Sequence, residues 1–192
     1  MLRLAVLVSG RGSNLQALLD HQGDDYAVVL VCSNRDGVPA LDRARRARVP
    51  ALVFEGRAAQ ADMARAIREA RADLIVLAGF DRLLTPAFFD VVGDSAALVS
   101  THPSLLPKFG GPGMIGRRVH EAVLAAGELE TGCTVFRTRP DRIDEGEILA
   151  QTRVPVIAGD TPETLELRVL EAEHRTLVAT VRGLARGTFA AR

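Results

Sequence analysis

The segment LAVLVSGRGSNL, residues 4–15, joins an apolar run to a helix pattern through two glycines. Its first part, Leu4–Val8, is unbroken apolar sequence, which is typical of a strand covered on both faces of a parallel sheet. The following residues, Asn14–Asp20, place three leucines on one side of a helix. A strand, a turn and a helix in this order predict the first β-α unit of an α/β fold.

The same alternation continues through the first hundred residues. Further strands are expected at Val28–Cys32, Ala51–Phe54, Leu74–Ala78 and Ala97–Thr101. Helices are expected between them, at Pro39–Arg48, Ala58–Ala70 and Pro86–Val92. This alternation predicts a Rossmann-like, mostly parallel sheet with helices on both faces. Because ligands of such sheets bind beyond the carboxyl ends of the strands, the segments after residues 8, 32, 78 and 100 are candidate site segments.

The second half of the chain has a different pattern. Arg117–Ala126 is expected to be a helix, and Thr131–Arg137 and Glu147–Val156 are expected to be two strands joined by a polar loop. A long final helix is predicted to begin at Thr161 and Pro162, with Thr161 as its N-cap and Pro162 in its first turn.

Composition excludes several classes of protein. The chain has 192 residues, 47% hydrophobic and 25% charged, and residues 1–192 are expected to form one globular domain. Its 24 basic and 24 acidic residues give no net charge, which argues against general binding to nucleic acid or a membrane surface. We expect neither a signal peptide nor a membrane span, which needs roughly 18 apolar residues. Because Cys32 and Cys133 have no metal-ligand spacing, we expect no metal and a reduced, cytoplasmic compartment.

The turn from Ser9 to Asn14 has features of an anion-binding site. Gly10 and Gly12 let backbone amides approach a ligand, and the helix N-terminus adds unpaired N–H groups and a positive dipole. The side chains of Ser13 and Asn14 can add further donors. The turn lacks the third glycine of a dinucleotide motif and the Lys-Ser/Thr of a P-loop, so a plain glycine turn with a serine cap remains the alternative.

A second candidate turn, Gly79–Leu84, follows a buried strand and carries Phe80, Leu83 and Leu84. An apolar turn of this kind can clasp a flat heterocycle through its main-chain polar groups. The alternative is a simple strand-to-helix turn with Arg82 on the surface.

His102 is the strongest catalytic candidate, because it directly follows a buried strand and is flanked by Pro103 and Pro107. Histidine titrates near neutral pH, which suits proton transfer. The acidic turn Asp141–Glu147 offers a carboxylate that can orient an imidazole and stabilise its cation, although solvated loop charge is the alternative. Other basic side chains are expected to be solvated surface groups: His21, Arg117, Arg118 and His120.

Four motifs occur in order along nearly the whole chain: G-S-N-L at Gly12–Leu15, A-G-F-x-R at Ala78–Arg82, H-P-S-L-L-P at His102–Pro107 and I-D-x-G at Ile143–Gly146. Together they resemble the phosphoribosylglycinamide formyltransferase family, which performs the first folate-dependent formyl transfer of purine synthesis. H-P-S-L-L-P marks the wider formyltransferase superfamily, and G-S-N-L narrows the resemblance to the purine branch. The resemblance implies the formyltransferase fold and 10-formyltetrahydrofolate as co-substrate, with no metal. It also implies that the partners are small-molecule substrates, not nucleic acid or membrane, and that the protein is a monomer or homodimer.

The resemblance also assigns roles to individual residues. Phosphoribosylglycinamide would be bound by Gly12, Ser13, Asn14 and Glu173. The folate would be held by Arg57 and by the chain at Asp81, Arg82, Leu83 and Leu84. The catalytic group would be His102, which handles protons, with its partner Asp144 and with Ser100. In the implied reaction the glycinamide amine attacks the formyl carbon, and the imidazolium of His102 stabilises the oxygen that becomes negative.

Two positions depart from the family pattern at the expected chemistry. Ser100 stands where the family has an asparagine that donates to the formyl oxygen, and Phe136 stands where many relatives have histidine. Losing one such donor typically lowers turnover by about 10²–10³. The loop before Asp144 is also one residue longer than the common form. Two alternatives therefore remain: another formyltetrahydrofolate-dependent transferase or hydrolase, and a non-catalytic folate- or nucleotide-binding paralogue.

Overall fold

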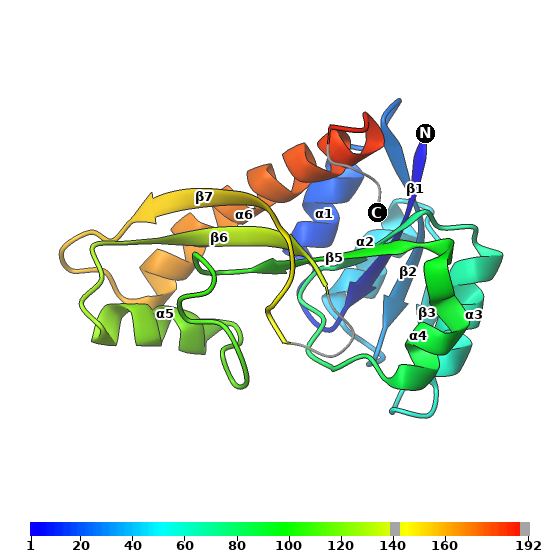
Figure 1. Cartoon of the computed structure of the whole chain (residues 1–192), viewed down its shortest axis with the longest axis horizontal. Helices are drawn as coiled ribbons and strands as arrows, with labels where there is room; N and C mark the ends of the chain where they lie inside the picture. Colours follow the sequence, from blue (N-terminus) through cyan, green and yellow to red (C-terminus); the bar gives the residue numbers. More distant parts are fainter. Residues whose placement is uncertain (139–142, 189–192) are drawn as a thin grey trace. The chain divides into compact units, whose positions relative to one another are not determined.

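The computed structural model describes residues 1–138 and 143–188. Within these ranges the strands follow the order β3-β2-β1-β4-β5-β6-β7 in a seven-stranded, mostly parallel sheet, which confirms the predicted α/β fold (Figure 1). The chain divides into two compact units, Met1–Val99 with Val181–Arg192 and Ser100–Thr180, which are described in turn.

The first unit alternates strands and helices. In chain order its elements are β1 (Leu2–Val8), α1 (Ser13–Asp20), β2 (Tyr26–Ser33), α2 (Pro39–Arg46), β3 (Ala51–Val53), α3 (Gln60–Glu69), β4 (Leu74–Leu77), α4 (Pro86–Val92), the short 3-10 helix η1 (Gly93–Ser95) and the first part of β5 (Ala97–His102). β1 pairs in parallel with β2 and with β4, and β2 pairs in parallel with β3. Each predicted element of this unit is present, with ends within two residues of the prediction.

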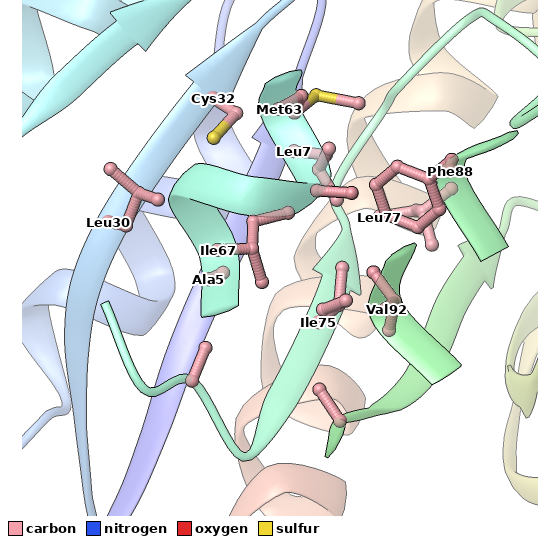
Figure 2. Packing of buried hydrophobic residues seen from close by; sticks show 13 residues of the cluster. Ala5, Leu7, Leu30, Cys32, Met63, Ile67, Ile75, Leu77, Phe88 and Val92 are labelled. Carbon is pink, nitrogen blue, oxygen red and sulfur yellow. The ribbon is translucent and has the colours of Figure 1, made fainter. Parts of the chain in front are cut away.

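The core of the first unit explains why β1 is central. The side chains of Leu4–Val8 are fully buried, as expected for a strand covered on both faces. Figure 2 shows Met63 and Ile67, one turn apart on α3, packed with side chains of β1, β2 and β4. Phe88 and Val92 of α4 belong to the same cluster. This packing holds α3 in place. Gln60, the first residue of α3, contacts the turn after β4.

The second unit is built on a hairpin and two helices. Its elements are the end of β5, α5 (Arg117–Ala125), β6 (Glu130–Arg137), β7 (Ile148–Pro155) and the greater part of α6 (Pro162–Ala185). β6 and β7 are antiparallel, and their core cluster consists of Val123, Cys133, Val154, Leu165, Val169 and Ala172. The predicted N-cap is confirmed, because the Thr164 N–H donates to the Thr161 hydroxyl at 3.3 Å.

One surface prediction is wrong. His120 is only 1% exposed, whereas His21, Arg117 and Arg118 are exposed as expected. His120 lies one helical turn before Val123, so it shares the inward face of α5. Burial lowers the pKa of His120 below its usual value; Glu166 opposes this shift and His102 adds to it. Burial therefore favours the neutral form of the His120 ring.

Three further observations bear on the predicted class of protein. Among residues 1–138 and 143–188, no helix is both long enough and apolar enough to cross a membrane. In the same ranges no cluster of three or more potential ligands is arranged to hold a metal ion. Cys32 and Cys133 are free thiols, and both are buried.

Candidate active site

His102 is the last residue of β5 and is almost completely buried. Its Nε2 lies 2.8 Å from the carbonyl oxygen of Phe109, and its Nδ1 lies 3.5 Å from Oδ2 of Asp144. A carbonyl oxygen only accepts hydrogen bonds, so Nε2 must carry a hydrogen. The second nitrogen then faces a carboxylate. Each nitrogen of the His102 ring therefore faces an oxygen that can accept a hydrogen bond.

Asp144 is held in place by the backbone around it. The Gly111 N–H donates to Asp144 Oδ2 at 2.9 Å, the oxygen that also faces His102. Asp144 has a φ of 52°, a left-handed conformation that aspartate tolerates better than most residues. A Cβ at Gly110 would lie 2.5 Å from Leu106 Cδ2 and 3.3 Å from Asp144 Cβ. Glycine at position 110 therefore lets the segment after His102 approach the carboxylate closely.

The segment after His102 is anchored to the hairpin by one buried hydroxyl. Thr134 on β6 donates to the carbonyl oxygen of Ser104 at 2.7 Å and accepts the N–H of Leu106 at 3.0 Å. Gln151 on β7 donates both to Thr134 Oγ1 and to the Leu106 carbonyl oxygen, each at 2.9 Å. These bonds satisfy backbone groups of an irregular buried segment and fix the path of the chain between His102 and Phe109.

We expect Thr134→Val to lower the free energy of unfolding by about 2–3 kcal/mol, because it leaves the buried Leu106 N–H and Ser104 carbonyl without their partner. The matched control is Thr131→Val on the same strand. The Thr131 hydroxyl is buried and has no hydrogen-bond partner among the described residues, so its replacement should not lower the free energy of unfolding. Urea unfolding measures both variants. Equal losses for the two would contradict the anchoring role of Thr134.

The remaining predicted residues of the second unit are placed as follows. Glu173 on α6 is buried, and its carboxylate accepts a hydrogen bond from the Thr101 hydroxyl. Ser100 is half-buried, with Oγ 3.5 Å from the Thr101 carbonyl oxygen, which is a weak contact. Phe136 is buried and pairs with Ile148 of β7, so this position is apolar core. Asp141 and Arg142 of the predicted acidic turn lie outside the described residues.

In the first unit, the turn after β1 is a tight turn that leads directly into α1. Gly12 has a φ of 72°, and a Cβ there would lie 2.6 Å from Ala40 Cβ, so only glycine fits. Gly12 is the N-cap of α1 and has no side chain with which to cap the helix, whose first residue is Ser13. The turn is tied to α2, because Ala40 N–H donates to the Gly10 carbonyl at 3.1 Å and Arg43 Nε donates to the Arg11 carbonyl at 2.9 Å.

The turn after β4 is clamped by Gln60, which the sequence analysis did not single out. Gln60 Nε2 donates to the Leu83 carbonyl oxygen at 2.9 Å, and Gln60 Oε1 accepts the Thr85 N–H at 2.6 Å. The Gln60 side chain is buried, whereas Leu83 and Arg82 are exposed and Leu84 packs against the core. Gln60 therefore fixes the turn at Leu83 and Thr85, and the Leu83 side chain is exposed.

Two more predicted residues lie beside this clamp. The Asp81 N–H donates to the hydroxyl of Ser9 at 3.0 Å, and the Asp81 carboxylate accepts from Asn34. Arg57 is exposed in the turn before α3, and its carbonyl oxygen accepts the Gln60 N–H at 3.3 Å. The structure thus brings Asp81 to the end of β1, while it leaves the Arg57 side chain in solvent.

Comparison with known proteins shows the family of the chain. A model of the formyl transferase family matches residues 2–181. The chain belongs to the formyl transferase family. Similar formyl transferases include glycinamide ribonucleotide transformylase 1 from Symbiobacterium toebii, whose solved structure is 35% identical, with a TM-score of 0.89 over 100% of this chain and 91% of that one.

Longer proteins contain a region that is similar to this formyl transferase chain. The trifunctional purine biosynthetic protein adenosine-3 of Drosophila pseudoobscura pseudoobscura is 42% identical over 198 residues, which cover 97% of this chain and 14% of that protein. Phosphoribosylglycinamide formyltransferase, chloroplastic, of Arabidopsis thaliana is 35% identical over 189 residues, 93% of this chain and 64% of that protein. The chain thus spans about one seventh of the first relative and less than two thirds of the second.

Proposed function

We propose that the protein transfers the formyl group of 10-formyltetrahydrofolate to the amine of 5-phosphoribosylglycinamide. One observation carries the proposal: a buried histidine at the end of β5 with a carbonyl acceptor at Nε2 and the Asp144 carboxylate at Nδ1. Membership of the formyl transferase family, and the names of the relatives, support the same reaction.

The proposed reaction requires the protein to stabilise a negative oxygen and to let protons move between two nitrogen atoms. The amine nitrogen bonds to the formyl carbon, whose oxygen becomes negative before the bond to the folate nitrogen breaks. A proton leaves the attacking amine, and the departing folate nitrogen gains one. The imidazolium of His102 would donate its Nε2–H to the negative oxygen, which would replace the Phe109 carbonyl oxygen as the acceptor. The Asp144 carboxylate would stabilise the positive charge of the imidazolium.

Substrate binding is proposed for the turns of the first unit and for one residue of the second. The turn at Gly12, Ser13 and Asn14 would bind the phosphate through backbone N–H groups at the start of α1, and Glu173 would bind the ribonucleotide. The clamped turn at Asp81–Leu84 would hold the pterin, with Leu83 as an apolar contact, and Arg57 would meet the folate tail.

The direct test is folate deformylation, measured by absorbance in the presence and absence of phosphoribosylglycinamide. We expect turnover that requires the ribonucleotide and persists in a metal chelator. Turnover without the ribonucleotide would instead identify a hydrolase. Binding of both substrates without any turnover would identify a non-catalytic paralogue, the alternative that Ser100 and Phe136 raise.

We expect Gln60→Ala to raise the KM for 10-formyltetrahydrofolate about tenfold and to change kcat less than threefold, because it frees the turn that would hold the pterin. Steady-state kinetics with each substrate varied in turn gives both constants. Gln16→Ala is the matched control for the folate KM, since the half-buried Gln16 of α1 bonds Asp20 and Arg43 rather than the turn after β4. An unchanged folate KM in Gln60→Ala would contradict the placement of the pterin.

We expect Ser100→Asn to raise kcat about tenfold. The longer amide side chain brings an N–H donor toward the oxygen that becomes negative, whereas serine is too short to donate directly. The comparison is made at saturating concentrations of both substrates, so that only the chemical step is tested. A fall in kcat would mean that Ser100 does not face the formyl oxygen.

We further propose that residues 1–192 act as a single formyltransferase domain in the cytoplasm, as a monomer or homodimer. The two free, buried cysteines support a reducing compartment.

A further inference from the structure

A polar network joins the turns that follow β1, β2 and β4 in the first unit. The Asp81 carboxylate accepts a hydrogen bond from Asn34 Nδ2 at 2.9 Å and forms an ion pair with the guanidinium of Arg35. Through its backbone N–H, Asp81 also donates to the Ser9 hydroxyl at 3.0 Å. One residue of the turn after β4 is thus bonded to both neighbouring turns.

Hydrogen bonds of the Arg35 backbone hold this residue in position for the contact with Asp81. The Ser33 hydroxyl donates to the Arg35 carbonyl at 2.7 Å and accepts the Arg35 N–H at 3.1 Å, which fixes the turn at the end of β2. From this position Arg35 reaches the carboxylate of Asp81, and its second terminal nitrogen lies 3.4 Å from the Ser9 carbonyl oxygen. A single guanidinium therefore touches the turn after β1 and the turn after β4.

The turn after β4 depends on such bonds. Gly79 has a φ of 71° with open space around it, so the backbone can pivot there, and no regular element lies between β4 and α4. Gln60 fixes the far side of the turn at Leu83 and Thr85. On the near side, the polar contacts with Ser9, Asn34 and Arg35 converge on Asp81, which is two residues beyond Gly79.

We infer that Arg35 and Asp81 are positioning residues, which fix the proposed phosphate-binding turn and the proposed pterin-binding turn relative to each other. This inference rests on the proposed function. The Asp81 side chain is occupied by Asn34 and Arg35, so it acts through the backbone of its turn and has no direct role in the chemistry. Loss of the pair is therefore expected to weaken binding of both substrates and to leave the chemical step nearly unchanged.

The pair is tested by a double-mutant cycle of Arg35→Ala, Asp81→Ala and the double variant, with Arg35→Lys as the conservative variant. We expect each alanine variant to raise both KM values about three- to tenfold, with kcat changed less than twofold. The double variant should be no worse than either single one, and Arg35→Lys should recover part of the loss. Arg45→Ala removes a similar exposed pair with Asp42 on α2 and serves as the control.

Hydrogen exchange of the free protein gives a readout that needs no activity. Amides of residues 78–85 and 9–14 should exchange faster in both alanine variants and at wild-type rates in Arg45→Ala. KM values within twofold of wild type, or unchanged exchange in these segments, would overturn the inference. If the wild-type protein transfers no formyl group, the proposed function fails by itself, and the exchange rates still decide whether the pair holds the two turns.

Discussion

Replacement of His102 by alanine is expected to lower kcat for formyl transfer by about three orders of magnitude, while each KM changes less than threefold. His102 is the buried group with an acceptor at both ring nitrogens, and in the proposed mechanism it alone donates to the oxygen that becomes negative. Removal of the ring leaves the binding turns of the first unit intact. The loss should therefore fall on the chemical step.

The control for this variant is His21→Ala, which removes an exposed histidine at the end of α1 and should retain wild-type kcat. Asp144→Asn should lower kcat by about 10²–10⁴, because it keeps the shape of the side chain and removes the charge that stabilises the cation. A His102→Ala enzyme with more than a tenth of wild-type kcat would remove His102 from the mechanism.

The second large effect is expected for Gly12→Ala, which should raise the KM for phosphoribosylglycinamide about 100-fold. Alanine at a φ of 72° is strained, and its Cβ would lie 2.6 Å from Ala40 Cβ and 2.8 Å from Ala40 Cα. Ala40 Cα belongs to the backbone of α2, so it cannot move aside as the end of a flexible side chain would. The turn must shift, and the N–H groups that would bind the phosphate move with it, each worth about 1.5–3 kcal/mol to a charged acceptor.

Gly23→Ala provides the matched comparison for Gly12→Ala. A Cβ at Gly23 would have no heavy atom within 4 Å beyond its chain neighbours, and Gly23 has no positive φ, so the same substitution should leave both KM values unchanged. Isothermal titration with phosphoribosylglycinamide measures binding directly, and thermal melting shows whether each variant is folded. A folded Gly12→Ala protein that binds the ribonucleotide as tightly as wild type would contradict the placement of the phosphate.

Local sequence patterns predicted the elements of this fold well. The apolar run Leu4–Val8 is the buried central strand, and Thr161 caps the last helix as its position before Pro162 indicated. In each case the signal and the structure it determines lie within a few residues. The burial of His120 could also have been predicted from the local sequence, because His120 lies one helical turn before Val123 on α5. The surface prediction was wrong because it was based on the charge of histidine and not on this spacing.

The supports of the candidate site were not predictable in the same way. Gln60 clamps a turn that lies 23 and 25 residues further along the chain, and Thr134 reaches back 28 and 30 residues to Leu106 and Ser104. Glutamine and threonine are common in helices and strands, so nothing in the local pattern marks them. Their roles come from the fold, which brings distant backbone groups within hydrogen-bond reach.

The central claim is that the formyl carbon moves from the folate to the glycinamide amine by a step that needs His102. The most direct measurement uses 10-formyltetrahydrofolate labelled with carbon-13 in the formyl group and follows the label by NMR. We predict that the label appears in the new amide of the ribonucleotide at the rate of folate deformylation, and that the His102→Ala variant produces almost none. Label released as formate, or an amide formed equally fast by His102→Ala, would contradict the claim.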